Sequence, residues 1–182
     1  MDVKPIVLVI MDGVGRGDGG PGDAVAVAKT PTLDKLFAER PYTWLKAHGT
    51  AVGLPSDDDM GNSEVGHNAL GSGQVFAQGA KLVSASIESG KMFASATWNE
   101  LISNVKASNG TLHFLGLFSD GNVHSSIDHL ERMIEKAHEE NIEKIRIHLM
   151  IDGRDVPPQS EPKYINRLEK FLASFEGCDY KI

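Results

Sequence analysis

From Thr111 onward the sequence alternates between short apolar segments and longer amphipathic ones. The segments 111–118, 144–151 and 179 onward have the length and the β-branched and aromatic content of strands. Between them, 126–140 and 160–175 repeat apolar residues at helical spacing. Because parallel strands need long crossover connections, this β-α-β-α-β order predicts an α/β fold with a parallel, doubly wound sheet.

The preceding part of the chain has a different character. Residues 4–11 form a continuous apolar run, which predicts a strand buried on both faces. Thr30 and Pro31 are typical of a helix start, and the helix that follows has an apolar stripe that we expect to be buried. Residues 49–73 are rich in glycine and predict a binding loop, whereas 82–93 and 98–108 predict helices.

Composition narrows the class of function. The 182 residues carry a net charge of −7, which argues against a nucleic-acid-binding surface. An acidic protein that binds a phosphorylated substrate must supply positive charge locally, through metal ions or a few arginines. The single cysteine, Cys178, excludes an internal disulfide and a cysteine-based zinc site and favours a reducing, cytoplasmic location. The longest apolar run, Ile6–Met11, is too short for a membrane span, and no signal peptide is recognisable.

Polar groups follow three predicted strands directly. They are Asp12, residues 119–124 (Ser-Asp-Gly-Asn-Val-His) and residues 152–155 (Asp-Gly-Arg-Asp). In open α/β sheets ligands bind at the carboxyl edge of the strands, so these groups are candidate site residues. Asp-Gly is also ordinary turn chemistry, and for Asp12 alone a turn is at least as good an interpretation as a metal ligand.

Residues 15–20 fit the spacing GxGxxG directly after a predicted strand. A dinucleotide-binding fingerprint must also open a helix whose N-terminus meets the pyrophosphate. Here Pro21 and Gly22 follow and no helix is predicted before Thr30, so we reject a nucleotide site.

Ser63 lies in the most informative segment, Met60-Gly-Asn-Ser-Glu-Val-Gly-His-Asn68. A serine needs activation to act as a nucleophile, and neither a Ser-His-Asp order nor a GxSxG elbow is present. Coordination of its oxygen to a metal is the remaining route. The alternative is that Ser63 caps a short helix, and the two interpretations are compatible because helix N-termini also favour phosphate. We interpret Asp57-Asp58-Asp59 nearby as a solvated run.

Of the seven histidines, His124 is the candidate site residue, because it lies in a loop at the end of a strand. His113 and His148 lie within predicted strands, where core or edge roles are more common. His138 is followed by two glutamates but lacks the second histidine of HExxH, so we expect a solvated helix face.

Taken together, these motifs resemble the cofactor-independent phosphoglycerate mutases of the alkaline phosphatase superfamily. The motifs are Asp12-Gly13, Thr30-Pro31 with Asp34, Gly53-Leu54-Pro55, residues 60–68, Ser119-Asp120-Gly121 with His124-Ser125, and residues 152–155. The resemblance runs along the whole chain, and the family's chains continue well beyond Ile182. It implies part of an alkaline-phosphatase-like domain, residues 1–77, followed by a truncated parallel-sheet α/β transferase domain, residues 78–182.

The resemblance also implies two divalent metal ions, with manganese the first expectation and magnesium or cobalt as alternatives. Asp12 and Ser63 would be metal ligands, and Ser63 would carry the phosphoryl group as phosphoserine. Asp155 would act as general acid and base, while Arg154, His124 and Asp155 would bind substrate. Asp23 stands where relatives usually have asparagine, which we expect to alter hydrogen bonding near Asp12.

The implied enzyme is an isomerase of glycolysis and gluconeogenesis that interconverts 3-phosphoglycerate and 2-phosphoglycerate without 2,3-bisphosphoglycerate. A metal-dependent phosphatase of the same superfamily is the alternative, and a non-catalytic binding module is a second one. The expected partner is the small-molecule substrate, with no nucleic acid or membrane, and we expect a monomer when the protein is complete. Residues 1–182 alone are expected to be inactive, because most of the implied metal ligands lie outside them.

Overall fold

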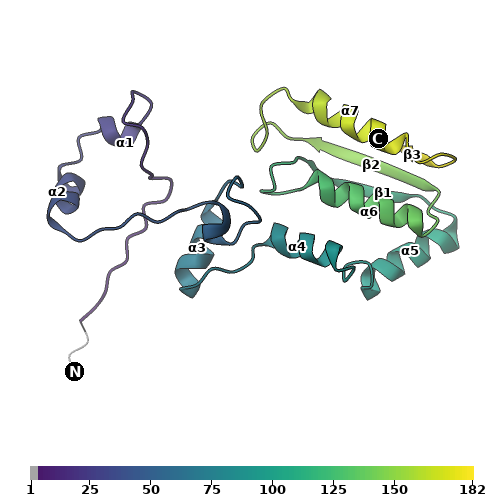
Figure 1. The fold of residues 1–182 in the computed structure, drawn as a ribbon, viewed down its shortest axis with the longest axis horizontal. Helices are drawn as coiled ribbons and strands as arrows, with labels where there is room; N and C mark the ends of the chain where they lie inside the picture. Colours follow the sequence, from purple (N-terminus) through teal and green to yellow (C-terminus); the bar gives the residue numbers. More distant parts are fainter. Residues whose placement is uncertain (1–3) are drawn as a thin grey trace. The chain divides into compact units, whose positions relative to one another are not determined.

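The computed structural model describes residues 4–182, which form two compact units that divide between Lys46 and Ala47. The first unit holds two short helices, α1 (Ala24–Val27) and α2 (Pro31–Glu39) (Figure 1). As predicted, α2 begins with Thr30 at the N-cap position and Pro31 in the first turn. The Thr30 hydroxyl donates to the Asp34 carboxylate at 3.0 Å instead of accepting from a backbone amide.

Three predictions for this unit are wrong. Helix α1 begins at Ala24, although the sequence predicts no helix before Thr30. Residues 4–11 form no strand, and their apolar side chains are exposed, Ile6 by 94%. A strand exists through its ladder of hydrogen bonds, and no described strand pairs with this segment. The apolar stripe of α2 is also not buried: Leu33 is half-buried, whereas Leu36 and Phe37 are 48% and 49% exposed. Phe37 packs instead against the rings of Tyr42 and Trp44, with centroids 5.3 and 6.0 Å away.

The second unit begins with irregular structure that contains two short helices. The 3₁₀-helix η1 (Gly49–Val52) and the helix α3 (Ser63–Ser72) lie within the predicted binding loop. Val52, Leu54 and Val65 form a small core of their own between them. Two further helices follow, α4 (Gly79–Glu88) and α5 (Ala96–Ser108). Helix α5 is close to its predicted range, whereas α4 ends five residues before its predicted end at 93.

The predicted β-α-β-α-β order is confirmed. Strands β1 (Leu112–Phe118), β2 (Lys144–Ile151) and β3 (Asp179–Lys181) form a parallel sheet in the order β1-β2-β3. Helix α6 (Ile127–Glu139) joins the first pair, and α7 (Glu161–Leu172) joins the second (Figure 1). The register pairs Phe118 with Ile151, so β1 and β2 end together and release their loops at one edge.

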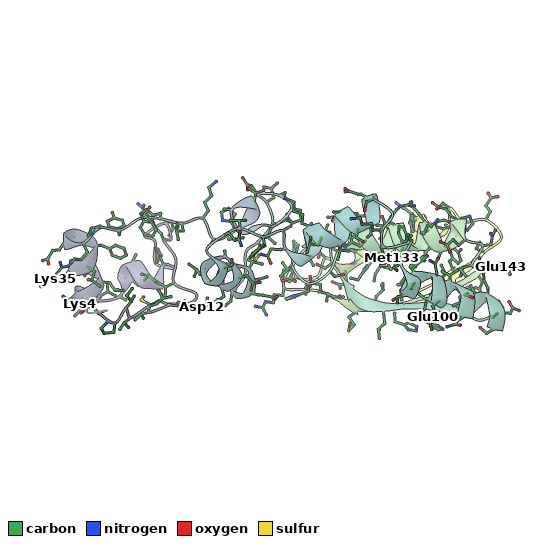
Figure 2. The ribbon with its side chains drawn as sticks, turned by 90° about the horizontal axis from the view of Figure 1, so that it is seen from below. Lys4, Asp12, Lys35, Glu100, Met133 and Glu143 are labelled. Atoms are coloured by element: carbon green, nitrogen blue, oxygen red, sulfur yellow. The ribbon has the colours of Figure 1, made fainter. Side chains whose placement is uncertain are left out.

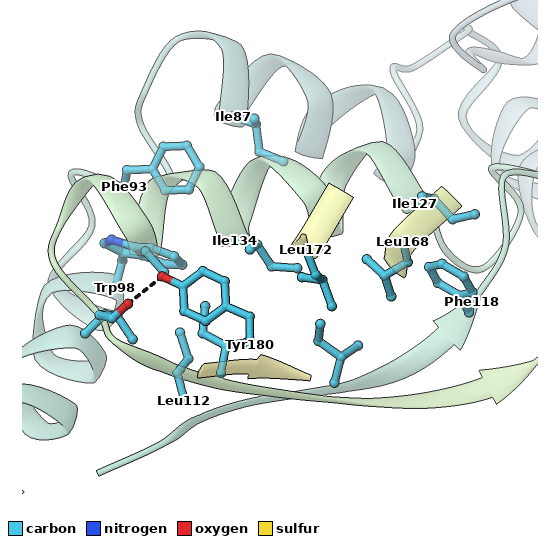
Figure 3. Close-up of a cluster of buried hydrophobic side chains, with 14 of the residues drawn as sticks. Ile87, Phe93, Trp98, Leu112, Phe118, Ile127, Ile134, Leu168, Leu172 and Tyr180 are labelled. Atoms are coloured by element: carbon cyan, nitrogen blue, oxygen red, sulfur yellow. Dashed lines mark hydrogen bonds between the residues drawn. The ribbon is translucent and has the colours of Figure 1, made fainter. Parts of the chain in front are cut away.

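The core lies between the sheet and its helices (Figure 3). Ile134 of α6, Ile145 of β2 and Leu168 of α7 have no exposed surface. Met133, labelled on α6 in Figure 2, packs against this cluster from its edge. The Tyr180 hydroxyl closes one end of the core by donating to the Ile142 carbonyl.

The sheet is not doubly wound within residues 4–182. One face is covered by helices, whereas Leu115 and Met150 on the other face are 74% and 51% exposed. Two right-handed crossovers that step in the same direction place both helices on the same face, which explains the arrangement. His113 and His148 are also exposed and hydrogen-bond each other at 2.9 Å. His113 lies on the edge strand β1, as expected, whereas His148 lies on the central strand β2 and is neither a core nor an edge residue.

Candidate functional site

Ser63 is the first residue of α3. The preceding residue, Asn62, caps the helix by accepting a hydrogen bond from the Val65 amide at 3.1 Å. Val65 is buried, which anchors this first turn, whereas Ser63 is exposed. The expected short helix is therefore present, although Asn62 and not Ser63 is its cap. A hydroxyl at this position lies at the positive end of the helix dipole, where phosphate is favoured.

Glycines hold the serine segment against its neighbours. A Cβ on Gly61 would lie 1.8 Å from the Ala47 carbonyl oxygen, and one on Gly53 would lie 1.6 Å from that of Phe76. Gly53 also has a φ of 86°, in the left-handed region. Only glycine permits these approaches, so Gly53 and Gly61 are needed for close backbone packing.

His67 lies one turn after Ser63, with its Nδ1 atom 3.1 Å from the Ser63 hydroxyl and 2.7 Å from the Ser63 carbonyl oxygen. The shorter contact requires a proton on Nδ1, because a carbonyl oxygen only accepts. A protonated Nδ1 has no lone pair with which to take the hydroxyl proton. This geometry therefore does not make His67 a general base for Ser63, in agreement with the absence of a triad pattern.

Asp152 organises the loop after β2. Its side chain is buried, and Oδ1 accepts hydrogen bonds from the amides of Arg154 at 2.9 Å and Asp155 at 3.2 Å. The Ser119 hydroxyl and these backbone amides hold the pKa of the Asp152 carboxyl below its ordinary value. Asp152 thus fixes the backbone of the two residues that the sequence singled out, while the Arg154 side chain is exposed and that of Asp155 is half-buried.

The loop after β1 is built in the same way. Ser119 is fully buried, its hydroxyl accepts from the Gly121 amide at 3.1 Å, and its carbonyl accepts from the Ile127 amide at the start of α6. A Cβ on Gly121 would lie 2.8 Å from the Asp155 carbonyl oxygen, so the two loops are in close contact. His124 lies farther along the loop and is exposed. As predicted from the strand ends, residues 119–124 and 152–155 meet at one edge of the sheet.

Sequence reasoning missed Asp59. The expectation of a solvated acidic run is wrong for this residue, which is only 8% exposed. Its Oδ2 accepts from the amide and the hydroxyl of Ser56, at 2.6 and 2.9 Å. Its Oδ1 accepts from the Asn122 side-chain amide at 3.2 Å. No local pattern marks Asp59, because its burial depends on a contact across 63 positions of sequence.

Asp12 belongs to the first unit, where it occupies a turn with Gly13 and is exposed. Asp23 caps α1 by accepting from the Ala26 amide at 3.1 Å, and also accepts from the Gly19 amide at 3.2 Å. These backbone hydrogen bonds, that of Ala26 first, lower the pKa of Asp23. The Asp23 side chain therefore accepts hydrogen bonds from its own glycine-rich loop and from the first turn of α1.

The oxygen donors of Asp12 and Ser63 are chemically suited to hard divalent cations such as Mn²⁺ and Mg²⁺. Within residues 4–182, no three histidine, cysteine, aspartate or glutamate side chains are grouped so that they could hold a metal ion. The residues fit the expected metal in donor type, and they supply only part of a ligand set.

Comparison with known proteins decides the family. Residues 83–180 match the family model described as "BPG-independent PGAM N-terminus". The chain belongs to the BPG-independent phosphoglycerate mutase family. Within it, the chain is 54% identical to a probable 2,3-bisphosphoglycerate-independent phosphoglycerate mutase of Leptospira interrogans and 47% identical to one of Trypanosoma brucei brucei. Each match covers 98% of this chain and 33% of the relative, so the chain spans about a third of the relatives' length.

The fold agrees with this family. A phosphoglycerate mutase of Leishmania mexicana, crystallised at low cobalt concentration, matches with a TM-score of 0.87 and 44% sequence identity. The match covers 94% of this chain and 32% of that protein. Among the helices of residues 4–182, none combines the length and the apolar character that crossing a membrane requires.

Proposed function

We propose that the protein carrying this chain interconverts 3-phosphoglycerate and 2-phosphoglycerate through a phosphoserine on Ser63, without 2,3-bisphosphoglycerate. Its relatives are named for this activity. The observation that carries the proposal is the position of Ser63 as the exposed first residue of α3, because the N-terminus of a helix favours a phosphoryl group. The glycolytic and cytoplasmic setting follows from the same proposal, and the lone Cys178 agrees with a reducing compartment.

In the proposed reaction the Ser63 hydroxyl first loses its proton to solvent. Its oxygen then attacks phosphorus, and the bond between phosphorus and the 3-oxygen of glycerate breaks. Asp155, protonated at that stage, gives its proton to the departing 3-oxygen. Glycerate then turns, Asp155 takes the proton of the 2-hydroxyl, and that oxygen attacks phosphorus while the bond to Ser63 breaks. Arg154 would orient the glycerate carboxylate through its guanidinium, and His124 would contact substrate from the neighbouring loop.

Asp12 and Ser63 would contribute to the binding of two divalent cations, with Mn²⁺ the first expectation and Mg²⁺ or Co²⁺ as alternatives. Bound cations would lower the pKa of the serine hydroxyl and so supply the activation that His67 does not provide. The remaining ligands are expected in the two thirds of the relatives' length that this chain does not span.

The division into a phosphatase-like segment, residues 1–77, and a transferase segment, residues 78–182, is part of the same proposal, as is a monomeric state. The match of the family model to residues 83–180 agrees with a distinct second segment. A phosphatase of the same superfamily would share Asp12 and Ser63 but would have no use for the paired loops that present His124, Arg154 and Asp155.

The test is Ser63→Ala in the complete protein, with Ser72→Ala in the last turn of α3 as the matched control. The expected results are that Ser63→Ala has no mutase turnover and gains no phosphate in intact-mass spectra after mixing with 3-phosphoglycerate, whereas Ser72→Ala behaves as wild type. Turnover by the Ser63→Ala protein would refute the proposal. Release of free phosphate without 2-phosphoglycerate by wild type would favour the phosphatase.

A further inference from the structure

Asp59 connects two parts of the second unit that are distant in sequence. Within the segment that leads to Ser63, Asp59 makes three hydrogen bonds. Its Oδ2 atom accepts two from Ser56, and the Asp59 backbone carbonyl accepts one from the Gly49 amide at 3.1 Å. Ser63 follows four positions later, after the closely packed Gly61. Asp59 therefore moves with the serine segment.

On the other side, Asp59 Oδ1 accepts from the side-chain amide of Asn122. Asn122 has a φ of 56°, and asparagine is one of the few residues that adopt the left-handed region readily. It follows Gly121, which lies against the Asp155 backbone, and precedes His124 by two positions. Asn122 therefore belongs to the closely packed pair of loops that presents Arg154, Asp155 and His124.

One hydrogen bond to a buried carboxylate thus joins the nucleophile's segment to the loops that would hold glycerate. Such charge-assisted bonds are among the stronger ones in proteins. The mutase reaction needs this connection, because glycerate must stay beside the phosphoserine until its 2-hydroxyl attacks. If the two segments separate, glycerate leaves and water takes its place.

We propose that Asp59 is a positioning residue: its hydrogen bond with Asn122 keeps the serine segment against the substrate loops while Ser63 carries the phosphoryl group. This inference rests on the proposed function. When the bond is lost, water attacks phosphorus, the bond from phosphorus to the Ser63 oxygen breaks, and that oxygen regains a proton from the water. Inorganic phosphate and glycerate are then released in place of 2-phosphoglycerate.

The experiment uses the complete protein and changes Asn122, so that the bonds between Asp59 and Ser56 stay intact. Asn122→Asp places a carboxylate against Asp59, and Asn122→Gly removes the side chain while tolerating the positive φ. The double variant Asp59→Asn/Asn122→Asp restores a donor and an acceptor with their roles exchanged. Asn141→Asp is the matched control, because Asn141 also has a positive φ, 61°, but lies in the turn between α6 and β2.

Three quantities are measured: formation of 2-phosphoglycerate, release of inorganic phosphate from 3-phosphoglycerate, and the thermal unfolding midpoint. For Asn122→Asp we expect the ratio of phosphate release to mutase turnover to rise about tenfold, the effect of losing one charge-assisted bond. Asn122→Gly should raise this ratio less, and the double variant should return the ratio toward the wild-type value. Asn141→Asp should leave the ratio unchanged.

An unchanged ratio in both Asn122→Asp and Asn122→Gly overturns the inference. A second result also overturns it: mutase turnover falls, phosphate release does not rise, and the double variant does not restore turnover. A purely structural role for Asp59 predicts that result. If Asn122→Asp does not fold, Asn122→Gly and the double variant decide by the same criteria. A wild-type protein that forms neither phosphoserine nor 2-phosphoglycerate refutes the proposed function itself, which is a separate outcome.

Discussion

Gly121 lies so close to Asp155 that a single Cβ on Gly121 would come within 2.8 Å of the Asp155 carbonyl oxygen and 2.9 Å of the Asp155 Cβ. Asp152 holds the same stretch from the other side, through the amides of Arg154 and Asp155. The loops after β1 and β2 therefore behave as one structural unit, and the following predictions depend on it.

Gly121→Ala should displace the loop that carries Arg154 and Asp155, because the contact involves backbone atoms that have no alternative rotamer. In the complete protein we expect mutase kcat/KM to fall by about 10- to 100-fold, as misplacement of positioned groups does in enzymes. Steady-state kinetics with 3-phosphoglycerate checks this. The control is Gly116→Ala in β1, where an added Cβ has nothing within 4 Å. Equal activity of the two variants would contradict the prediction.

Asp152→Ala should destabilise the chain by about 1–3 kcal/mol, since it leaves two backbone amides without their acceptor in a buried setting. Asp152→Asn should lower the free energy of unfolding by less, because the asparagine side-chain oxygen still accepts from the amides of Arg154 and Asp155. Urea unfolding of residues 1–182, followed by circular dichroism, measures both. If the alanine and asparagine variants are equally stable, the hydrogen bonds from the Arg154 and Asp155 amides do not stabilise the fold as described.

The lowered pKa of Asp152 gives this contribution a pH dependence. Its folded pKa lies below the unfolded value of about 3.9, so the ionised carboxylate stabilises the fold above that pH. The contribution is lost as the pH falls through the folded pKa. Asp152→Asn cannot titrate, so the difference in unfolding free energy between wild type and this variant should be constant between about pH 7 and pH 5 and shrink below about pH 4. A difference that stays constant down to about pH 3 would be inconsistent with this assignment.

Removal of metal tests the proposed activation of Ser63. A chelator should abolish mutase turnover of the complete protein, added Mn²⁺ should restore it, and omission of 2,3-bisphosphoglycerate should have no effect. Residues 1–182 alone should show no turnover, because Asp12 and Ser63 supply only part of a ligand set. Each result is read from a coupled assay for 2-phosphoglycerate. Mutase turnover by residues 1–182, or full activity in chelator, would contradict the proposed mechanism.

Several elements were predictable because their determinants are local. Of the predicted stripe of α6, Ile127, Ile134 and Ala137 are buried and Leu130 is half-buried, and β2 spans the predicted residues. Segments whose structure depends on partners were not predictable. Residues 4–11 have the composition of a buried strand, yet they pair with no described strand. Whether an apolar run becomes a strand depends on a neighbour, which the run itself does not specify.

By itself, the sequence determined the alternation of strands and helices and the strand-end placement of residues 119–124 and 152–155, and its serine segment carries the family resemblance from which phosphoryl transfer is expected. These follow from periodicity and short motifs, which act over a few residues. Only the tertiary structure decided that both crossover helices cover one face, that Asp152 anchors Arg154 and Asp155 beside Gly121, and that Asp59 is buried against Asn122. The physical reason is clearest at Asp59: its buried carboxylate accepts from Asn122, 63 positions away, and only folding brings that donor to it.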